Sequence, residues 1–315
     1  MGEEGRQGPL KATAMIARVE DQVSRVIVGK RREVRVILAA IIAGGHILLE
    51  GLPGVAKTTM AKAIAAAFDL KFSRIQFTPD LLPGDVLGTF IYTGTGFVFR
   101  EGPIFAQLVL ADEVNRANPR TQAAFLEAMQ EGQVTVWGET RRLPRPFHVI
   151  ATMNPVETTG VYPLPEAHLD RFMARIPLGY PSPEELVDIM DAARLAEDME
   201  LERVAGPEDF IKARSDVWGV RADYNIKVYI ARIVEGAGRR REAASPLSPR
   251  AAISTLQLAR SLAALRGRGY VTPDDVKEAA RLALPHRIVL KPEYEASGAS
   301  RDEIVERVLG EVEPP

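Results

Sequence analysis

The sequence predicts an α/β fold in roughly the first 180 residues and an all-α domain in the remainder. Up to about Tyr180, short apolar runs alternate with segments of helical periodicity, which is typical of a parallel sheet flanked by helices. After the proline-rich segment 180–183 the strand-like runs disappear and helical patterns continue. We therefore expect a core of residues 1–180 followed by a helical domain of residues 181–315.

The individual elements follow from hydrophobic periodicity and from helix-start signals. The candidate strands are Ile47–Glu50, Phe72–Gln76, Gln107–Ala111, Val149–Thr152 and Ala174–Pro177. The candidate helices of the core are Glu33–Ala43, Thr58–Phe68, Pro119–Gln130 and Pro165–Arg171. Those of the second half are Pro183–Leu195, Pro207–Trp218, Asn225–Gly236, Pro249–Arg266, Pro273–Leu284 and Arg301–Val312. Asn118 before Pro119 is a typical helix start, with a capping side chain followed by proline at the first helical position.

Two segments interrupt the alternation of strands and helices. Residues 80–103 are rich in glycine and aromatic residues, and the alternation within Thr89–Arg100 predicts a hairpin. Gln133–Leu143, with Gly138 near its middle, predicts a second hairpin.

Composition narrows the class of protein. The chain has 315 residues, no cysteine and a formal net charge of −2. Disulfides and cysteine nucleophiles are therefore excluded, and the near balance of charge does not favour nucleic acid as a main partner. The longest apolar stretch, Val36–Ala43, is too short for a membrane span, and the polar start of the chain does not resemble a secretory signal. We expect a cytoplasmic location.

A phosphate-binding loop is predicted between the first strand and the helix that follows it. The segment is Gly51-Leu52-Pro53-Gly54-Val55-Ala56-Lys57-Thr58, followed by Thr59. Such a loop turns backbone N–H groups toward phosphates; Lys57 adds a cation, and the Thr58 hydroxyl can bind Mg²⁺. Ala56 stands where the general pattern has glycine. The alternative is a glycine-rich turn that happens to end in Lys-Thr.

An acidic pair, Asp112 and Glu113, follows the apolar run that begins at Leu108. A carboxylate at the carboxyl end of a strand can hold Mg²⁺ through water, as we expect for Asp112, and Glu113 can then orient and deprotonate an attacking water. The alternative is a capping role for both acids. Because a phosphate loop lies upstream, the two motifs together predict hydrolysis of a bound nucleotide.

Three further residues are candidates for reading the γ-phosphate. Asn154 ends the next strand, where a neutral amide can bind both the phosphate and the attacking water. Arg171 lies near the end of a predicted helix, and Arg250 lies at the start of another. Arginine suits phosphate oxygens, although a surface ion pair is the usual role of an arginine.

Taken as a set, these motifs resemble the MoxR group of AAA+ ATPases, and the resemblance covers about residues 23–285. The segments that carry it are Phe77–Gly88, Val109–Gly132, Ala151–Pro155, Gly160–Phe172 and Ser248–Ala251. The resemblance implies a P-loop AAA+ core with a five-stranded sheet in the order 5-1-4-3-2, a small helical lid, and ATP or ADP with Mg²⁺ at the junction of core and lid.

The resemblance also assigns roles to residues. It implies that Asn154 is the sensor-1 residue, that Arg171 is an arginine finger for the neighbouring subunit, and that Arg250 is the sensor-2 residue. Val28 and Gly29 would lie beside adenine; the family usually has Gln at the next position, where this chain has Lys30, so only backbone and apolar contacts are expected there. Residues 80–103 would be the helix-2 insert, and residues 133–143 the pre-sensor-1 hairpin, facing a pore or a partner.

The function that this resemblance implies is ATP hydrolysis by a homo-oligomeric ring, a hexamer, that remodels or helps to assemble partner proteins. Partners with a von Willebrand factor A domain are associated with the family. One alternative is the ATPase subunit of a metal chelatase. Another is a motor stimulated by nucleic acid, since Arg141, Arg142 and Arg145 make the second hairpin locally basic.

Overall fold

A five-stranded parallel sheet forms the centre of the core, as predicted. A computed structural model describes residues 8–52, 56–154, 160–196 and 201–315. The strands of the sheet are β1 (Ile47–Gly51), β2 (Phe72–Gln76), β5 (Leu108–Asp112), β8 (His148–Met153) and β9 (Ala174–Leu178). They lie in the order β2-β5-β8-β1-β9. Counted along the chain as core strands one to five, this is the predicted order 5-1-4-3-2, and every strand begins and ends within one residue of its predicted bounds.

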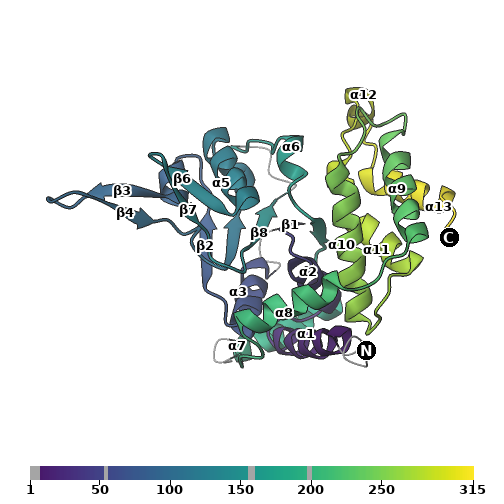
Figure 1. The fold of residues 1–315 in the computed structure, drawn as a ribbon, viewed down its shortest axis with the longest axis horizontal. Helices are drawn as coiled ribbons and strands as arrows, with labels where there is room; N and C mark the ends of the chain where they lie inside the picture. Colours follow the sequence, from purple (N-terminus) through teal and green to yellow (C-terminus); the bar gives the residue numbers. More distant parts are fainter. Residues whose placement is uncertain (1–7, 53–55, 155–159, 197–200) are drawn as a thin grey trace, which may run out of the picture.

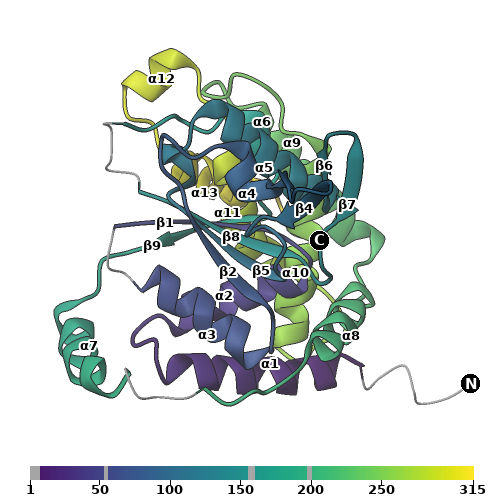
Figure 2. The same ribbon diagram turned by 90° about the vertical axis from the view of Figure 1, so that its left-hand side faces the viewer.

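The central strands are apolar on both faces because helices cover both faces (Figure 2). Successive residues of β1 point to opposite sides, so Ile47 and Leu49 join one buried cluster and Leu48 joins the other. β1 runs parallel to β8 on one side and to β9 on the other. This pairing brings the carboxyl ends of the strands to a common edge, where Asp112, Glu113 and Asn154 lie.

One face of the sheet is covered by α1 (Gly8–Ser24), α2 (Arg31–Ile42), α3 (Lys57–Ala67) and α8 (Pro207–Trp218) (Figure 2). α1 was not among the predicted helices, although Ile16, Val19 and Val23 have helical spacing and are fully buried. α2 has an apolar face that is completely buried from Ile37 to Ile42.

The other face is covered by α4 (Pro83–Leu87), α5 (Pro119–Glu131) and α6 (Glu166–Leu169) (Figure 2). α5 begins as predicted: the Thr121 amide donates to Asn118 Oδ1 at 3.0 Å, and Pro119 occupies the first turn. α6 is shorter than expected, so that Arg171 lies beyond its end.

The second half of the chain is helical, as predicted. It contains α7 (Pro183–Ala196), α8, α9 (Tyr224–Gly238), α10 (Pro249–Leu265), α11 (Pro273–Ala283), a short 3₁₀ turn η3 (Pro285–Arg287), α12 (Pro292–Ala296) and α13 (Arg301–Glu311). α9 to α13 form a bundle beside the core (Figure 1). α8 packs on α1 and α2 as well as on α10, and the domain boundary after Tyr180 stays a prediction. None of the helices in the described ranges has the length and apolarity needed to cross a membrane.

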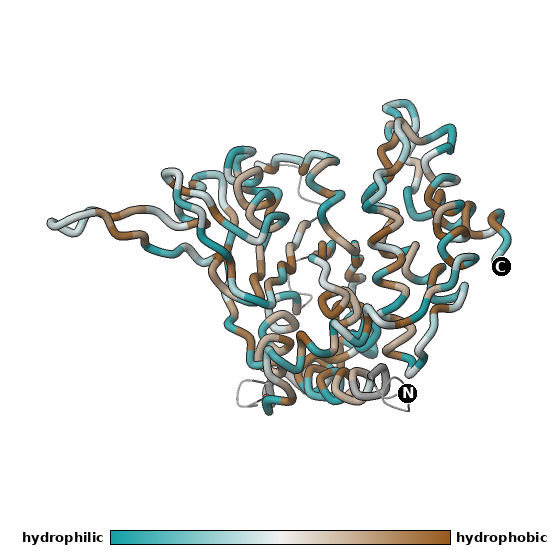
Figure 3. The backbone as a smooth tube through the Cα atoms, in the orientation of Figure 1, coloured by the Kyte–Doolittle hydropathy of each residue, from teal (hydrophilic) through white to brown (hydrophobic). Residues whose placement is uncertain are grey.

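Both predicted hairpins are present and contact each other. The first consists of β3 (Gly88–Tyr92) and β4 (Phe97–Glu101) and projects far from the body (Figure 1); the second consists of β6 (Gln133–Val136) and β7 (Glu139–Arg142). Trp137, at the tip of the second, stacks on Phe90 with a centroid distance of 5.0 Å and meets Phe97 edge-on at 5.2 Å. Apolar segments of the projecting hairpin reach well beyond the core (Figure 3), and Tyr92 and Phe97 are mostly exposed.

Candidate active site

The predicted phosphate loop joins β1 to α3, in the strand–loop–helix context that a P-loop requires. Gly51 ends β1, Leu52 is exposed, and Pro53, Gly54 and Val55 lie outside the described residues. Lys57 begins α3 and its Nζ donates to the Gly51 carbonyl at 2.7 Å, which closes the loop. α3 is eleven residues long, and its first amides and positive dipole end are suited to bind an anion.

Ala56 explains why the general pattern has glycine at this position. Its φ is +59°, in the left-handed region, where an L-residue with a side chain costs roughly 1–2 kcal/mol relative to glycine. Alanine has the smallest side chain that carries this cost. Ala56 therefore adopts this backbone conformation at a modest energetic penalty.

The acidic pair lies at the carboxyl end of β5, next to the phosphate loop. Asp112 Oδ1 accepts a hydrogen bond from the Thr152 hydroxyl at 2.6 Å, and the same hydroxyl accepts from the Glu113 amide at 2.9 Å. Thr152 on β8 thus fixes both acids to the neighbouring strand. Glu113 has φ +56°, a conformation that non-glycine residues adopt rarely and that often marks a functional position.

Two residues that the sequence analysis missed complete the acidic end of the site. Arg74 Nη2 donates to Asp112 Oδ2 at 2.7 Å, and Gln76 Nε2 donates to Glu113 Oε2 at 2.8 Å. Both come from β2, which pairs with β5. Arg116 also contacts Glu113 Oε2, at 3.1 Å. In the sequence, Arg74 and Gln76 are marked only by their position near the end of a predicted strand. Their proximity to the acids depends on the pairing of β2 with β5.

The phosphate loop and the acidic pair share one cavity of about 400 Å³. Its lining comes from the loop, from β2, from the end of β5 and from the end of β8, and consists of Ala56, Lys57, Thr58, Thr59, Arg74, Gln76, Asp112, Glu113 and Asn154. The structure therefore brings Asn154 into the same cavity as Glu113 and the loop residues Ala56 to Thr59. The Thr58 hydroxyl and the Asp112 carboxylate both line this cavity, and oxygen ligands of this kind are those that Mg²⁺ prefers.

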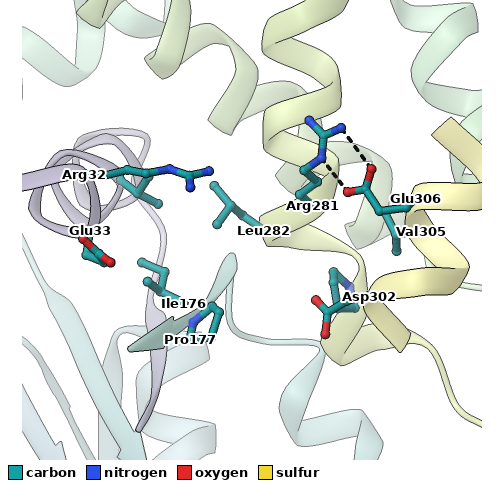
Figure 4. A pocket seen from close by; sticks show the side chains of 11 residues that line it. Arg32, Glu33, Ile176, Pro177, Arg281, Leu282, Asp302, Val305 and Glu306 are labelled. Atoms are coloured by element: carbon teal, nitrogen blue, oxygen red, sulfur yellow. Dashed lines mark hydrogen bonds and ion pairs between the residues drawn. The ribbon is translucent and has the colours of Figure 1, made fainter. Parts of the chain in front are cut away.

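A second, smaller cavity of about 230 Å³ lies where the core meets the helical bundle (Figure 4). α2 contributes Arg32 and Glu33, β9 contributes Ile176 and Pro177, and α11 and α13 contribute the Arg281–Glu306 ion pair. Neither Val28 nor Gly29 lines this cavity or the first one. Instead Gly29, with φ +74°, is packed against the side chain of Glu185, which also pairs with Lys30 at 3.7 Å. The adenine contact predicted for Val28 and Gly29 stays a prediction.

Arg171 and Arg250 lie outside the phosphate cavity and close to each other. Arg250 Nη1 is 3.6 Å from Asp170 Oδ2, directly beside Arg171. Burial, followed by the positive charge of Arg250, lowers the pKa of Arg171. Within the described part of the chain, Nε and Nη1 of Arg171 are buried without a hydrogen-bond partner. The two arginines thus lie near each other and outside the cavity that Asp112 and Glu113 line.

The site and the sheet topology define the class of protein, a P-loop ATPase of the AAA type. Comparisons with known proteins agree. Residues 46–174 match the family model "ATPase family associated with various cellular activities (AAA)", and residues 239–308 match the AAA lid domain. A solved structure from Cytophaga hutchinsonii, described as that of a candidate ATPase, has a TM-score of 0.89 and 40% sequence identity, covering 98% of this chain and 97% of that one.

Two relatives narrow the class further. The chain is 45% identical to YeaC of Bacillus subtilis, named as an uncharacterized protein, over 96% of this chain and 95% of that protein. It is 40% identical to Chaperone MoxR1 of Mycobacterium tuberculosis, over 99% of this chain and 85% of that protein. The chain belongs to the MoxR family of AAA+ ATPases, as its motifs indicated, and it is an ATP hydrolase.

Proposed function

We propose that this chain is a Mg²⁺-dependent ATPase that works as a homo-oligomeric ring, a hexamer, and uses ATP to remodel or assemble partner proteins. The observation that carries the proposal is the single cavity shared by Lys57, Asp112 and Glu113. A chaperone role is supported by the name of the relative MoxR1. Partners with a von Willebrand factor A domain are part of the proposal on the basis of the family resemblance.

Each wall of the cavity has a separate task in hydrolysis. Lys57 and the amides at the start of α3 would hold the phosphates, while Thr58 and Asp112 would hold Mg²⁺, whose positive charge offsets charge on the phosphate oxygens. Glu113 would accept a proton from the attacking water. Gln76, which donates to Glu113 Oε2 at 2.8 Å, would orient that carboxylate, and Asn154 would bind the γ-phosphate or the water.

We further propose that Arg171 and Arg250 both act on the nucleotide of a neighbouring subunit. They lie together beside Asp170, and neither lines the phosphate cavity of its own chain. Two nearby guanidinium groups are suited to receive a phosphate, which would satisfy the buried Nε and Nη1 of Arg171. A ring gives each cavity such a pair from the adjacent subunit.

The experiment uses Glu113→Gln protein with Mg-ATP. We expect the variant to bind ATP, to hydrolyse it at least a hundredfold more slowly than the wild type, and to retain partner proteins in a pull-down. Undiminished hydrolysis would contradict the role of Glu113. Recovery of a tetrapyrrole-binding subunit would favour the chelatase alternative, and DNA-stimulated hydrolysis would favour the nucleic-acid motor.

A further inference from the structure

A large groove lies at the edge of the sheet opposite to the phosphate cavity. It has a volume of about 790 Å³ and is lined by residues that precede β1 and β8, by the exposed face of α8, and by residues 129–133, where α5 ends and β6 begins. Gly44 and His46 precede β1, and residues 144–147 precede β8. Because the strands are parallel, these residues mark the amino ends of the strands. In Figure 2, α8 accordingly lies on the side away from the arrowhead of β9.

Three arginines line this groove: Arg142, Arg145 and Arg214. In the described ranges, none of the three is in an ion pair with a carboxylate. Other arginines of the chain show the contrast, since Arg266, Arg268 and Arg281 each contact an acid. Burial and the nearby charge of Arg145 lower the pKa of Arg214. The groove thus concentrates positive charge, with Glu131 as the one acid in its lining.

The Arg214 side chain is held in place before any ligand arrives. Its guanidinium lies 5.0 Å from the centre of the Trp218 ring, and Trp218 Nε1 donates to the Ala43 carbonyl at 3.2 Å. Gly44, with φ +96°, lets the backbone approach so closely that a Cβ there would lie 2.7 Å from Arg214 Nη2. A guanidinium fixed in this way loses little conformational entropy when it binds a carboxylate.

We propose that this arginine groove binds an acidic peptide segment of a partner protein, with carboxylates on Arg145 and Arg214 and an apolar side chain against Trp218 and Ile211. Trp218 and Ile211 are about half exposed, at 49% and 48%. The rest of the lining favours a peptide over a nucleic acid, because it includes Pro144, Pro146, Phe147 and the acidic Glu131. A nucleic acid would need a longer run of cations to follow its phosphates. Peptide binding in this groove does not depend on ATP hydrolysis.

Trp218 lines the groove and can serve as a fluorescent probe of binding. The chain has two tryptophans, so a Trp137→Phe background leaves Trp218 as the only one. We expect a hexaglutamate peptide to change Trp218 emission and to bind more weakly as salt rises. The double variant Arg145→Gln, Arg214→Gln should lower the affinity at least tenfold. The control Arg203→Gln, Arg239→Gln removes two exposed arginines elsewhere and should change the affinity less than twofold.

Three outcomes would overturn the proposal. The groove and control variants could lose equal affinity for hexaglutamate, or Trp218 emission could stay unchanged at saturating peptide. The third is that a thymidine oligonucleotide binds to the groove more tightly than hexaglutamate does. The single variant Arg145→Gln, in an exposed loop residue, keeps the test valid if the double variant does not fold. ATPase activity measured alongside separates this site from the catalytic cavity, since the groove variants should retain it.

Discussion

Arg287 Nε donates to Asp170 Oδ1 at 2.9 Å and thereby joins the helical bundle to the residue beside Arg171. The Arg287 guanidinium is buried and also donates to the carbonyl of Phe172 at 2.7 Å and to the Ser254 hydroxyl at 3.0 Å. Ser248, at the start of α10, donates to the same Asp170 carboxylate at 2.8 Å. These hydrogen bonds therefore tie the bundle directly to the segment that carries Arg171.

Replacing Arg287 by Met should destabilise the protein by roughly 3–5 kcal/mol, because Asp170 would lose one of its donors and several buried carbonyls would lose a partner. Chemical denaturation would measure the loss. The control is Arg281→Met, which removes an arginine whose ion pair with Glu306 is about half exposed and should cost about 1 kcal/mol or less. Equal losses in the two variants would contradict a structural role for the buried arginine.

Replacing Lys57 by Ala should weaken ATP binding at least tenfold, because the cation that faces the β- and γ-phosphates is lost. Titration with a fluorescent ATP analogue would measure the change. Lys62→Ala, on an exposed position of the same helix, is the matched control and should bind normally. Normal affinity in the Lys57 variant would remove our assignment of the phosphate loop.

If Arg171 acts across a subunit boundary, mixing two inactive variants should restore activity. An Arg171→Ala subunit keeps an intact cavity, and a Lys57→Ala subunit keeps an intact arginine, so a mixed ring contains competent interfaces. An arginine supplied to a phosphoryl-transfer site contributes roughly 10³–10⁵ in rate, so even partial rescue is measurable in an ATPase assay. Absence of rescue in rings shown to be mixed would contradict action in trans. The same mixing with Arg250→Ala tests the second arginine.

Two buried histidines should make stability depend on pH. Burial, followed by the nearby His148 and Arg214, lowers the pKa of His46 from 6.5 to about 3, and burial lowers that of His148 to about 4. In both cases the unfolded chain binds the proton more readily. The contribution of the two neutral histidines to the free energy of unfolding is thus fully present above pH 6.5. It falls as the pH decreases toward their pKa values in the folded protein, by roughly 1.4 kcal/mol per pH unit for each histidine.

Denaturation at pH 7 and at pH 5 would measure this dependence. In His148→Asn the amide can still donate to the Gly45 carbonyl, which His148 Nδ1 contacts at 3.0 Å, but it does not titrate. The free energy of unfolding of the wild type should differ between pH 7 and pH 5. We expect this difference to be about half as large in the His148→Asn variant. His168→Asn, at a partly exposed position, is the comparison. If the difference in unfolding free energy between pH 7 and pH 5 is the same in His148→Asn as in the wild type, the lowered pKa of His148 is contradicted.

Features that depend on residues close together in the chain could be predicted from the sequence. The strand before Gly51, the helix start at Asn118 and the acidic pair after Leu108 are all local signals, and the structure contains each of them. The strand order came from the family resemblance, since periodicity identifies strands but does not order them. The structure confirms that order.

Features that depend on contacts between distant segments were missed. Arg74 reaches Asp112 only because β2 pairs with β5, and Arg287 contacts Asp170 across 117 positions of sequence. The pairing of Phe90 with Trp137 likewise required the positions of both hairpins. In each case the sequence shows a suitable residue type but contains no local signal for its partner.

The projecting β3–β4 hairpin has a mechanical consequence. Because its tip lies far from the sheet on which its base rests (Figure 1), a small rotation of the core sweeps the tip through a much longer arc. The stacking of Trp137 on Phe90 supports this arm near its middle. This geometry favours a long displacement of the tip for a slight reorientation of the core.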